Sequence, residues 1–307
     1  MKRLLVTGYG GFVAGNVVVE ARGAWEVHAL ARSGAPPVHE GVHLRTLDLR
    51  DAAHLRLLFQ DARPEAVIHA AGLADIDYCE AHKEEAEEVN VGVTLELARL
   101  CREGGARLIF CSTDSVFDGV KGLYTEEDAP RPVNFYAETK VRAERIVREE
   151  AGAGVAARLS LVLGLPAFSR GNSLLAKMIS TLEQGKEVRF PADEVRTPVD
   201  VVTVGRALLE LAGGDFTGVL HLAGSTRLNR YDMGLQIAAR LGYPPGLVLA
   251  TDSSSMGGRA PRPKDVSLES SRARSLLRTP MLTLREGLDL ALNALERKQD
   301  EKPGDPA

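Results

Sequence analysis

Tyr136 and Lys140 form a Y-x-x-x-K pair whose side chains could carry acid–base chemistry. On a helix, a spacing of four residues places both side chains on one face. A phenol with a pKa of about 10 is a poor proton donor and acceptor at neutral pH, but a nearby ammonium favours the phenolate and lowers that pKa. The pair could therefore exchange a proton with a substrate oxygen, and the ammonium could also donate hydrogen bonds to a ribose.

A hydroxyl group precedes this pair at the end of an apolar run. Ser112, Thr113 and Asp114 follow that run, and ligands of open α/β sheets bind at the carboxyl ends of strands. The hydroxyl of Thr113, or of Ser112, could donate a hydrogen bond to a carbonyl oxygen that receives hydride, and Asp114 could contact a sugar hydroxyl. The alternative is strand-end capping and turn formation, for which these residue types are common.

The segment TGYGGFVAG at residues 7–15 has the spacing of a dinucleotide-binding loop. Gly8 permits a tight turn, Gly11 lets the backbone approach a pyrophosphate, and Ala14 lets the helix pack closely on the strand. Free N–H groups at the start of the helix would then meet the negative charge. The alternative is a glycine-rich turn without a ligand. The residues expected to bind the cofactor here are Gly8, Gly11, Phe12 and Val13.

The choice between NADP and NAD depends on the end of the second strand. NAD sites often have an acidic residue there for the ribose hydroxyl, whereas this chain has Arg32, which suits a 2′-phosphate. We therefore expect NADP, with NAD as the alternative; a solvated loop arginine is the competing interpretation. Asp48 and Leu49 follow the third strand, and the Asp48 carboxylate could accept from an adenine amino group. It could instead cap the next helix, although Asp51 is better placed for that.

The elements that must position these residues alternate along the first half of the chain. Apolar β-rich runs separated by amphipathic helices predict a parallel sheet covered on both faces, which is a doubly wound α/β fold of the Rossmann type. The expected strands are Arg3–Thr7, Glu26–Leu30, Val42–Leu47, Ala66–Ala70, Arg107–Cys111 and Val155–Leu159. The expected helices include Ala52–Asp61, Glu84–Glu103 and Tyr136–Glu150.

The second half has a looser rhythm, with prolines between short elements. We predict a dinucleotide-binding domain over residues 1–164, with a return to the sheet at 200–223. Residues 165–199 and 224–297 would form a smaller, discontinuous substrate lobe. The polar stretch 298–307 is expected to be a disordered tail.

Composition excludes several classes of protein. The formal net charge of −4 gives no general attraction to nucleic acid, and no apolar run is long enough to cross a bilayer. The start of the chain lacks the features of a signal peptide, so we expect a cytoplasmic protein. The three cysteines have no C-x-x-C spacing and the seven histidines no H-E-x-x-H pattern, so no metal site is expected.

With these motifs in view, the chain resembles the extended short-chain dehydrogenases/reductases, and within them the dTDP-4-dehydrorhamnose reductase group. The matching segments are TGYGGFVAG, Asp48-Leu49, HAAG at 69–72, STDSVFDG at 112–119, NFYAETKVRAE at 134–144, RTPV at 196–199 and RPKDVSL at 262–268. The resemblance implies that Thr113, Tyr136 and Lys140 are catalytic and that Ala70 and Ala71 lie beside the cofactor. Two aromatic positions that the group associates with the sugar are absent, since Ser115 replaces a tyrosine and Leu161 lies in a segment where a tryptophan is usual.

The resemblance implies an NADP(H)-dependent reductase of a keto-sugar that is nucleotide-linked. Arg196, in the later lobe, would close over the sugar or its phosphates, and a homodimer is one assembly to consider. Two other functions fit the same resemblance. One is a nucleotide-sugar epimerase or dehydratase that retains its nicotinamide. The other is a non-catalytic regulatory protein similar to the beta subunit of methionine adenosyltransferase, because function belongs to the site rather than to the fold.

Overall fold

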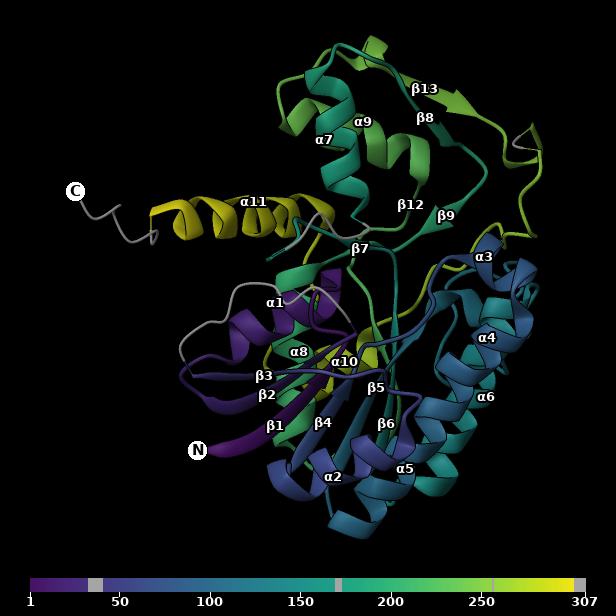
Figure 1. The fold of residues 1–307 in the computed structure, drawn as a ribbon. Coiled ribbons are helices and arrows are strands. Elements are labelled where there is room, and N and C mark those ends of the chain that lie inside the picture. The colour runs from purple at the N-terminus through teal and green to yellow at the C-terminus, as the bar shows by residue number, and fades with distance from the viewer. Residues whose placement is uncertain (33–40, 169–172, 256, 301–307) are drawn as a thin grey trace.

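A parallel sheet of seven strands organises the chain, which the computed structural model describes over residues 1–32, 41–168, 173–255 and 257–300 (Figure 1). The strand order is β11-β6-β5-β4-β1-β2-β3, and every neighbouring pair is parallel. This confirms the predicted doubly wound Rossmann-type fold, in which the order reverses between β1 and β4 and opens a crevice at the carboxyl ends. The strands are β1 (Lys2–Thr7), β2 (Trp25–Ala31), β3 (Val42–Thr46), β4 (Ala66–His69), β5 (Arg107–Thr113), β6 (Gly154–Leu159) and β11 (Gly218–Leu222).

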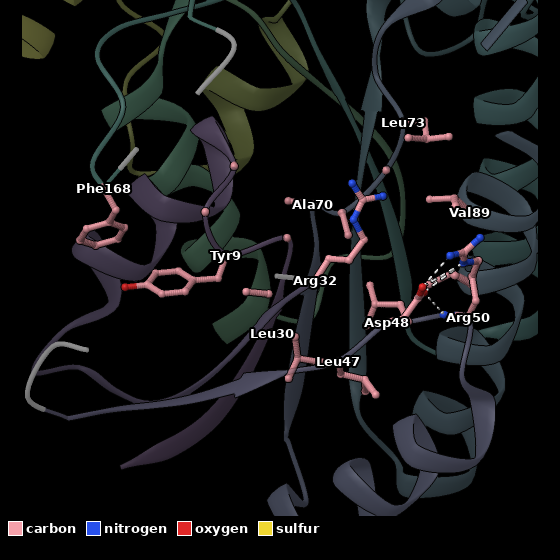
Figure 2. Close-up of a pocket in the computed structure, with 18 residues that line it drawn as sticks. Tyr9, Leu30, Arg32, Leu47, Asp48, Arg50, Ala70, Leu73, Val89 and Phe168 are labelled. Carbon is pink, nitrogen blue, oxygen red and sulfur yellow. Dashed lines mark hydrogen bonds and ion pairs between the residues drawn. The ribbon is translucent and has the colours of Figure 1, made fainter. Parts of the chain in front are cut away.

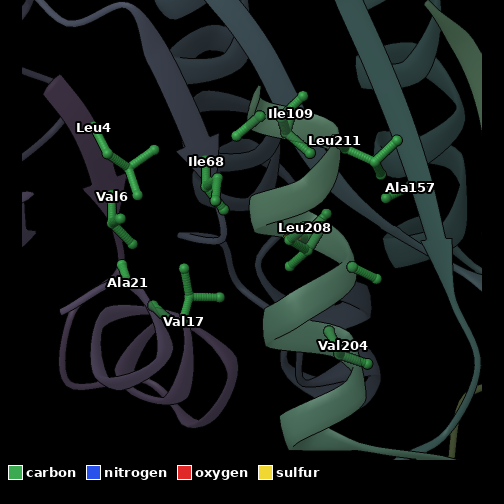
Figure 3. Packing of buried hydrophobic residues seen from close by; sticks show 14 of the residues in the cluster. Leu4, Val6, Val17, Ala21, Ile68, Ile109, Ala157, Val204, Leu208 and Leu211 are labelled. Carbon is green, nitrogen blue, oxygen red and sulfur yellow. The ribbon is translucent and has the colours of Figure 1, made fainter. Parts of the chain in front are cut away.

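Helices cover both faces of the sheet because its inner strands are buried on both sides, as in β4 and β6, all of whose residues are buried. On one face, α1 (Phe12–Ala21) and α8 (Val201–Gly213) pack against the strands. Figure 3 shows Val17 of α1 and Leu208 of α8 lying against Leu4 and Ile68 of the sheet. The other face is covered by α2 (Ala52–Ala62), α5 (Val93–Gly104) and α6 (Phe135–Glu150).

The helix expected over Glu84–Glu103 is interrupted. It consists of α4 (Lys83–Glu87), a π-helical turn over Glu88–Gly92, and α5. Buried Asn90 lies in that turn, where its amide nitrogen donates to the Leu73 carbonyl at 3.1 Å and to Thr139 Oγ1 at 3.0 Å. The turn thus fastens the segment after β4 to α6, which is why this irregularity matters for the site.

A second lobe is built from later segments and has its own apolar core, with Met178, Ile237 and Val248 among its members. Figure 1 shows it at the top of the view, above the large sheet. Its main elements are α7 (Leu174–Glu183), α9 (Arg230–Arg240), and the strands β8 (Val188–Pro191) and β13 (Val248–Thr251), which pair in parallel. Shorter elements are α3 (Ile76–Ala81), α10 (Ser271–Leu276), β7 (Val162–Leu163), β9 (Val195–Arg196), β10 (Val199–Asp200) and β12 (Leu228–Asn229).

The end of the chain differs from the expected tail. The last helix, α11, runs over Leu284–Asp300 and so continues past residue 298, where the disordered tail was predicted to begin. The remainder of that prediction, residues 301–307, lies outside the described residues. Across the described part of the chain, no helix has both the length and the apolar character needed to span a membrane.

Candidate active site

Two hollows meet at the glycine-rich loop. The first, of about 610 Å³, lies between the loop and the ends of β2 and β4, and Figure 2 shows the side chains around it. The second, of about 600 Å³, lies between the large sheet and the second lobe and is lined by Thr113 and Tyr136. Gly11, Ala70 and Gly72 line both hollows. The two therefore form one track along the carboxyl edge of the sheet, as an extended dinucleotide requires.

The glycine loop is shaped by contacts that admit no side chain. Gly8 has a φ of +81°, and a Cβ there would lie 2.9 Å from the Cα of Ala71. A Cβ on Gly11 would lie 2.9 Å from the Gly8 carbonyl oxygen. Helix α1 begins directly after Gly11 without a side-chain cap, which leaves its first N–H groups available. The loop thus fits a pyrophosphate at a helix N-terminus, beside Phe12 and Val13.

Arg32 and Asp48 lie at the far end of the first hollow. Figure 2 shows the Arg32 guanidinium group reaching into the hollow from the end of β2. Among the described residues, Arg32 has no hydrogen bond or ion pair, so its donors are available to a phosphate. Asp48 instead accepts from Arg50 Nε at 3.0 Å and Nη2 at 2.6 Å, which lowers the pKa of Asp48 to about 2. Leu49 packs beside them against the apolar cluster under α2.

Thr113 and Tyr136 both line the second hollow, and Lys140 is buried one turn of α6 beyond Tyr136. Thr113 ends β5, and its Oγ1 accepts from the Ser115 N–H at 3.1 Å. Tyr136 stands in the first turn of α6, a helix that Asn134 caps by accepting from the Ala137 N–H at 2.9 Å. The hydroxyl of Thr113 lies close enough to Tyr136 to act on the pKa of its phenol. The fold therefore places the hydroxyl of Thr113 and the phenol of Tyr136, both predicted from the sequence, in the lining of one hollow.

Burial determines the electrostatics of the pair. It raises the pKa of Tyr136, whereas the Thr113 hydroxyl acts to lower it. It lowers the pKa of Lys140 to about 8, and the ammonium lies 4.1 Å from the centre of the Phe110 ring. Desolvation thus moves the pKa of the phenol further above 7 and brings the pKa of the ammonium closer to 7. The idea that Lys140 acidifies the phenol stays a prediction.

Asp114 and Arg196, the two residues predicted to contact substrate, line this hollow, but most of their polar atoms already interact with other protein groups. Asp114 is buried, accepts from Ser115 Oγ at 3.2 Å and lies 3.7 Å from Arg196 Nε. Arg196 donates to the backbone carbonyls of Val195 at 2.8 Å and Lys264 at 3.1 Å. Arg196 therefore braces the wall of the hollow, and only part of its guanidinium group remains for a ligand.

Sequence reasoning missed a cluster of three arginines around the same hollow. Arg230 lies 3.0 Å and Arg259 3.7 Å from the carboxylate of buried Glu194, and Arg262 lies 2.9 Å from Asp77. One carboxylate oxygen of Glu194 has no hydrogen-bond partner among the described residues, and neither has Arg230 Nε. Arg262 lies in the matching segment at 262–268, but Arg230 comes from α9, so the convergence of the three arginines depends on the tertiary fold.

Comparison with known proteins identifies a family and several relatives that match most of the chain. A family model described as "RmlD substrate binding domain" matches residues 1–297. The chain is 30% identical to mouse methionine adenosyltransferase 2 subunit beta, over 92% of this chain and 85% of that protein. It is 29% identical to the probable low-salt glycan biosynthesis reductase Agl14 of Haloferax volcanii, over 80% and 82%.

Solved structures agree with this placement. A hypothetical dTDP-4-dehydrorhamnose reductase from Sulfolobus tokodaii is 31% identical, with a TM-score of 0.82 over 93% of this chain and 99% of that one. A dTDP-4-dehydrorhamnose reductase from Bacillus anthracis, solved with NADP, has a TM-score of 0.86 at 22% identity, over 96% of this chain and all of that one. The second likeness supports the fold alone.

Proposed function

We propose that this chain, which belongs to the RmlD substrate binding domain family among the extended short-chain dehydrogenases/reductases, reduces a keto group on a nucleotide-linked sugar with NADPH. The observation that carries this proposal is that Thr113 and Tyr136 line the second hollow, which adjoins the glycine loop, while Lys140 follows Tyr136 by one turn of α6. A phosphate-binding loop and a proton donor on one track are the two parts that carbonyl reduction needs.

The proposed reaction adds a hydride and a proton to a ketone and yields a secondary alcohol. NADPH, when bound, supplies the hydride. Tyr136 gives its hydroxyl proton to the carbonyl oxygen, and Thr113 donates a hydrogen bond that orients this oxygen. Lys140, one helical turn after Tyr136, holds the nicotinamide ribose and keeps a positive charge near the phenol. Lys140 is buried and the other two side chains are partly buried, which strengthens these interactions because charges and dipoles act more strongly away from water.

The preference for NADPH rests on Arg32. Its guanidinium group enters the first hollow at the adenosine end, where the 2′-phosphate distinguishes the two nicotinamide cofactors. Asp48, which is paired with Arg50, has little remaining capacity to accept from a ribose hydroxyl.

The arginine cluster supports a nucleotide-linked substrate. Arg230, Arg259 and Arg262 join Arg196 at this hollow, so that four guanidinium groups face three carboxylates. The acids are Asp75, Asp114 and Glu194. Each guanidinium group can donate two parallel hydrogen bonds to the oxygens of one phosphate. A diphosphate therefore suits this wall of the second lobe. Glu194 holds two of the arginines in position without a ligand.

The direct test is to measure NADPH oxidation, through the loss of NADPH absorbance, with each member of a panel of nucleotide-linked keto-sugars. We expect turnover with at least one nucleotide-linked ketone and a KM at least tenfold higher for the same sugar without its nucleotide. Arg262→Met should raise the KM for the linked substrate and leave kcat within about threefold. A lack of turnover across the panel, or equal KM values for linked and free sugars, would contradict the proposal.

A second function is favoured by the 30% identity to methionine adenosyltransferase 2 subunit beta. In that case the chain would bind a dinucleotide and a partner enzyme without catalysing reduction. Mixing it with a catalytic methionine adenosyltransferase subunit and measuring complex formation by size-exclusion chromatography tests this directly. A stable complex without ketone reduction would favour the regulatory role; a retained nicotinamide with no net oxidation would favour an epimerase.

A further inference from the structure

Two histidines and a glutamate meet on strands β2 and β3, outside both hollows. His28 and His43 are direct partners in the parallel register of these strands. Glu26 precedes His28 by two residues, so both side chains point to the same face of the sheet. β3 is the last strand of the sheet, and Val42 and Leu44 on its opposite face pack into the core. The three polar side chains therefore share the less covered face at the sheet's edge.

The side chains converge closely. His28 Nε2 lies 3.3 Å and His43 Nε2 lies 3.8 Å from Glu26 Oε1. One ligand atom from each of the three residues lies within 4.8 Å of the others. The two imidazole rings stack with centroids 4.8 Å apart and an angle of 24° between their planes. His43 and Glu26 remain 50% and 41% exposed, so an ion can reach them from solvent.

This donor set has the composition of a zinc site. Two imidazole nitrogens and one carboxylate oxygen are ligands that Zn²⁺ prefers, with water in the fourth position. Ligand atoms bonded to one tetrahedral zinc lie about 3.4 Å apart, as follows from metal–ligand distances of about 2.1 Å. Two of the observed separations already approach this value, and rotation of the exposed His43 ring would adjust the third.

We propose that Glu26, His28 and His43 bind Zn²⁺ and that the ion joins the edge strand β3 to β2. The role is structural, because no residue of the cluster lines either hollow. Arg45 is the cation on the same strand face, and its Nη1 donates to the Leu44 carbonyl at 3.3 Å. The Glu26 carboxylate supplies the negative charge that offsets it. The ion would stiffen the two strands that lead to Arg32 and Asp48.

The test uses the full chain, stripped with a chelator and free of any histidine tag, titrated with ZnCl₂ in a calorimeter. We expect one saturable site per chain and a higher melting temperature with Zn²⁺. Glu26→Gln and His43→Gln should each weaken Zn²⁺ binding at least tenfold, and both change exposed side chains. His54→Gln is the matched control, because His54 is an exposed histidine that also contacts an acid, Asp51, but belongs to no such cluster among the described residues.

Two outcomes would overturn the proposal. One is an affinity in Glu26→Gln and His43→Gln equal to that of wild type and His54→Gln. The other is an anomalous difference map from zinc-soaked crystals with no peak between β2 and β3. The expected map has a peak within bonding distance of all three side chains. Because the readouts are binding, melting temperature and diffraction, the result is independent of the proposed reductase activity.

Discussion

Asp114 and Arg196 form a buried ion pair that links the end of β5 to the second lobe, with Arg196 Nε 3.7 Å from Asp114 Oδ2. Burial raises the pKa of Asp114, and the guanidinium charge acts to lower it. The residue next to Asp114 is Thr113, which carries the hydroxyl of the proposed reaction. The pair therefore connects the second lobe to the residue beside the proposed catalytic hydroxyl.

Arg196→Met should destabilise the protein by about 3–5 kcal/mol, because it leaves a buried carboxylate without its cation. Urea unfolding measures this change, and Arg285→Met on the exposed face of α11 is the control. The double variant Asp114→Asn/Arg196→Met should recover part of the loss, since no uncompensated charge then remains. A loss no larger than that of the control would show that the pair is unimportant for stability.

Gly8→Ala should weaken cofactor binding at least tenfold. The new Cβ would stand 2.9 Å from the Ala71 backbone on a residue with φ of +81°, so the loop must move away from the pyrophosphate position. Fluorescence titration with NADPH measures the change. Gly246→Ala serves as control because its Cβ would meet nothing within 4 Å. Equal affinities for the two variants would remove the loop from the cofactor site.

Arg32→Asp should reverse the cofactor preference. Loss of a charge-assisted contact to the 2′-phosphate costs about 1.5–3 kcal/mol, which corresponds to a fall in NADPH affinity of about 10- to 100-fold. The new carboxylate should also improve NADH binding by accepting from the ribose hydroxyls. Dissociation constants for both cofactors provide the measurement. An unchanged ratio of the two constants would mean that Arg32 is only solvated.

Lys140→Met should abolish turnover and yet stabilise the protein near pH 7. Burial lowers the pKa of Lys140 from 10.5 to about 8, so between these values the unfolded chain holds a proton that the folded protein lacks. The wild type therefore gains stability as the pH rises through this window, and the variant does not. At about pH 7 the variant should be more stable by up to about 3 kcal/mol, at about 1.4 kcal/mol per pKa unit.

Unfolding of wild type and Lys140→Met at about pH 7 and pH 10 checks this expectation. The difference between the two proteins should be larger at the lower pH and shrink at the higher one. A difference that is the same at both pH values would show that Lys140 keeps its ordinary pKa in the folded protein.

The sequence was sufficient for the sheet and for the motifs within single elements. Alternating apolar runs predicted the strands to within a few residues, since strands buried on both faces must be apolar throughout. The glycine loop and the pair Tyr136 and Lys140 each lie within one short segment. Their spacing alone therefore predicted a loop before a helix and two residues one helical turn apart. The π-helical turn at Glu88–Gly92 escaped prediction because its cause, the bonding of Asn90 to Leu73 and Thr139, is tertiary.

The groups that the sequence did not reveal are those assembled across elements. Glu194 meets Arg230 and Arg259 only after the second lobe folds. His28 and His43 are adjacent through the register of two parallel strands, whereas a search for histidine pairs on one helix cannot find them. Which residues face each other on neighbouring strands depends on the strand register, which cannot be predicted from a single sequence.

In the proposed reaction, Tyr136 donates the proton while a nicotinamide bound beside it donates hydride. Its most direct test is the single-turnover reduction of a nucleotide-linked keto-sugar by wild type and Tyr136→Phe, each saturated with NADPH. We expect Tyr136→Phe to bind NADPH within about threefold of wild type but to reduce the ketone at least a hundredfold more slowly, in line with the usual contribution of general acid catalysis. A rate in Tyr136→Phe close to that of wild type would contradict it.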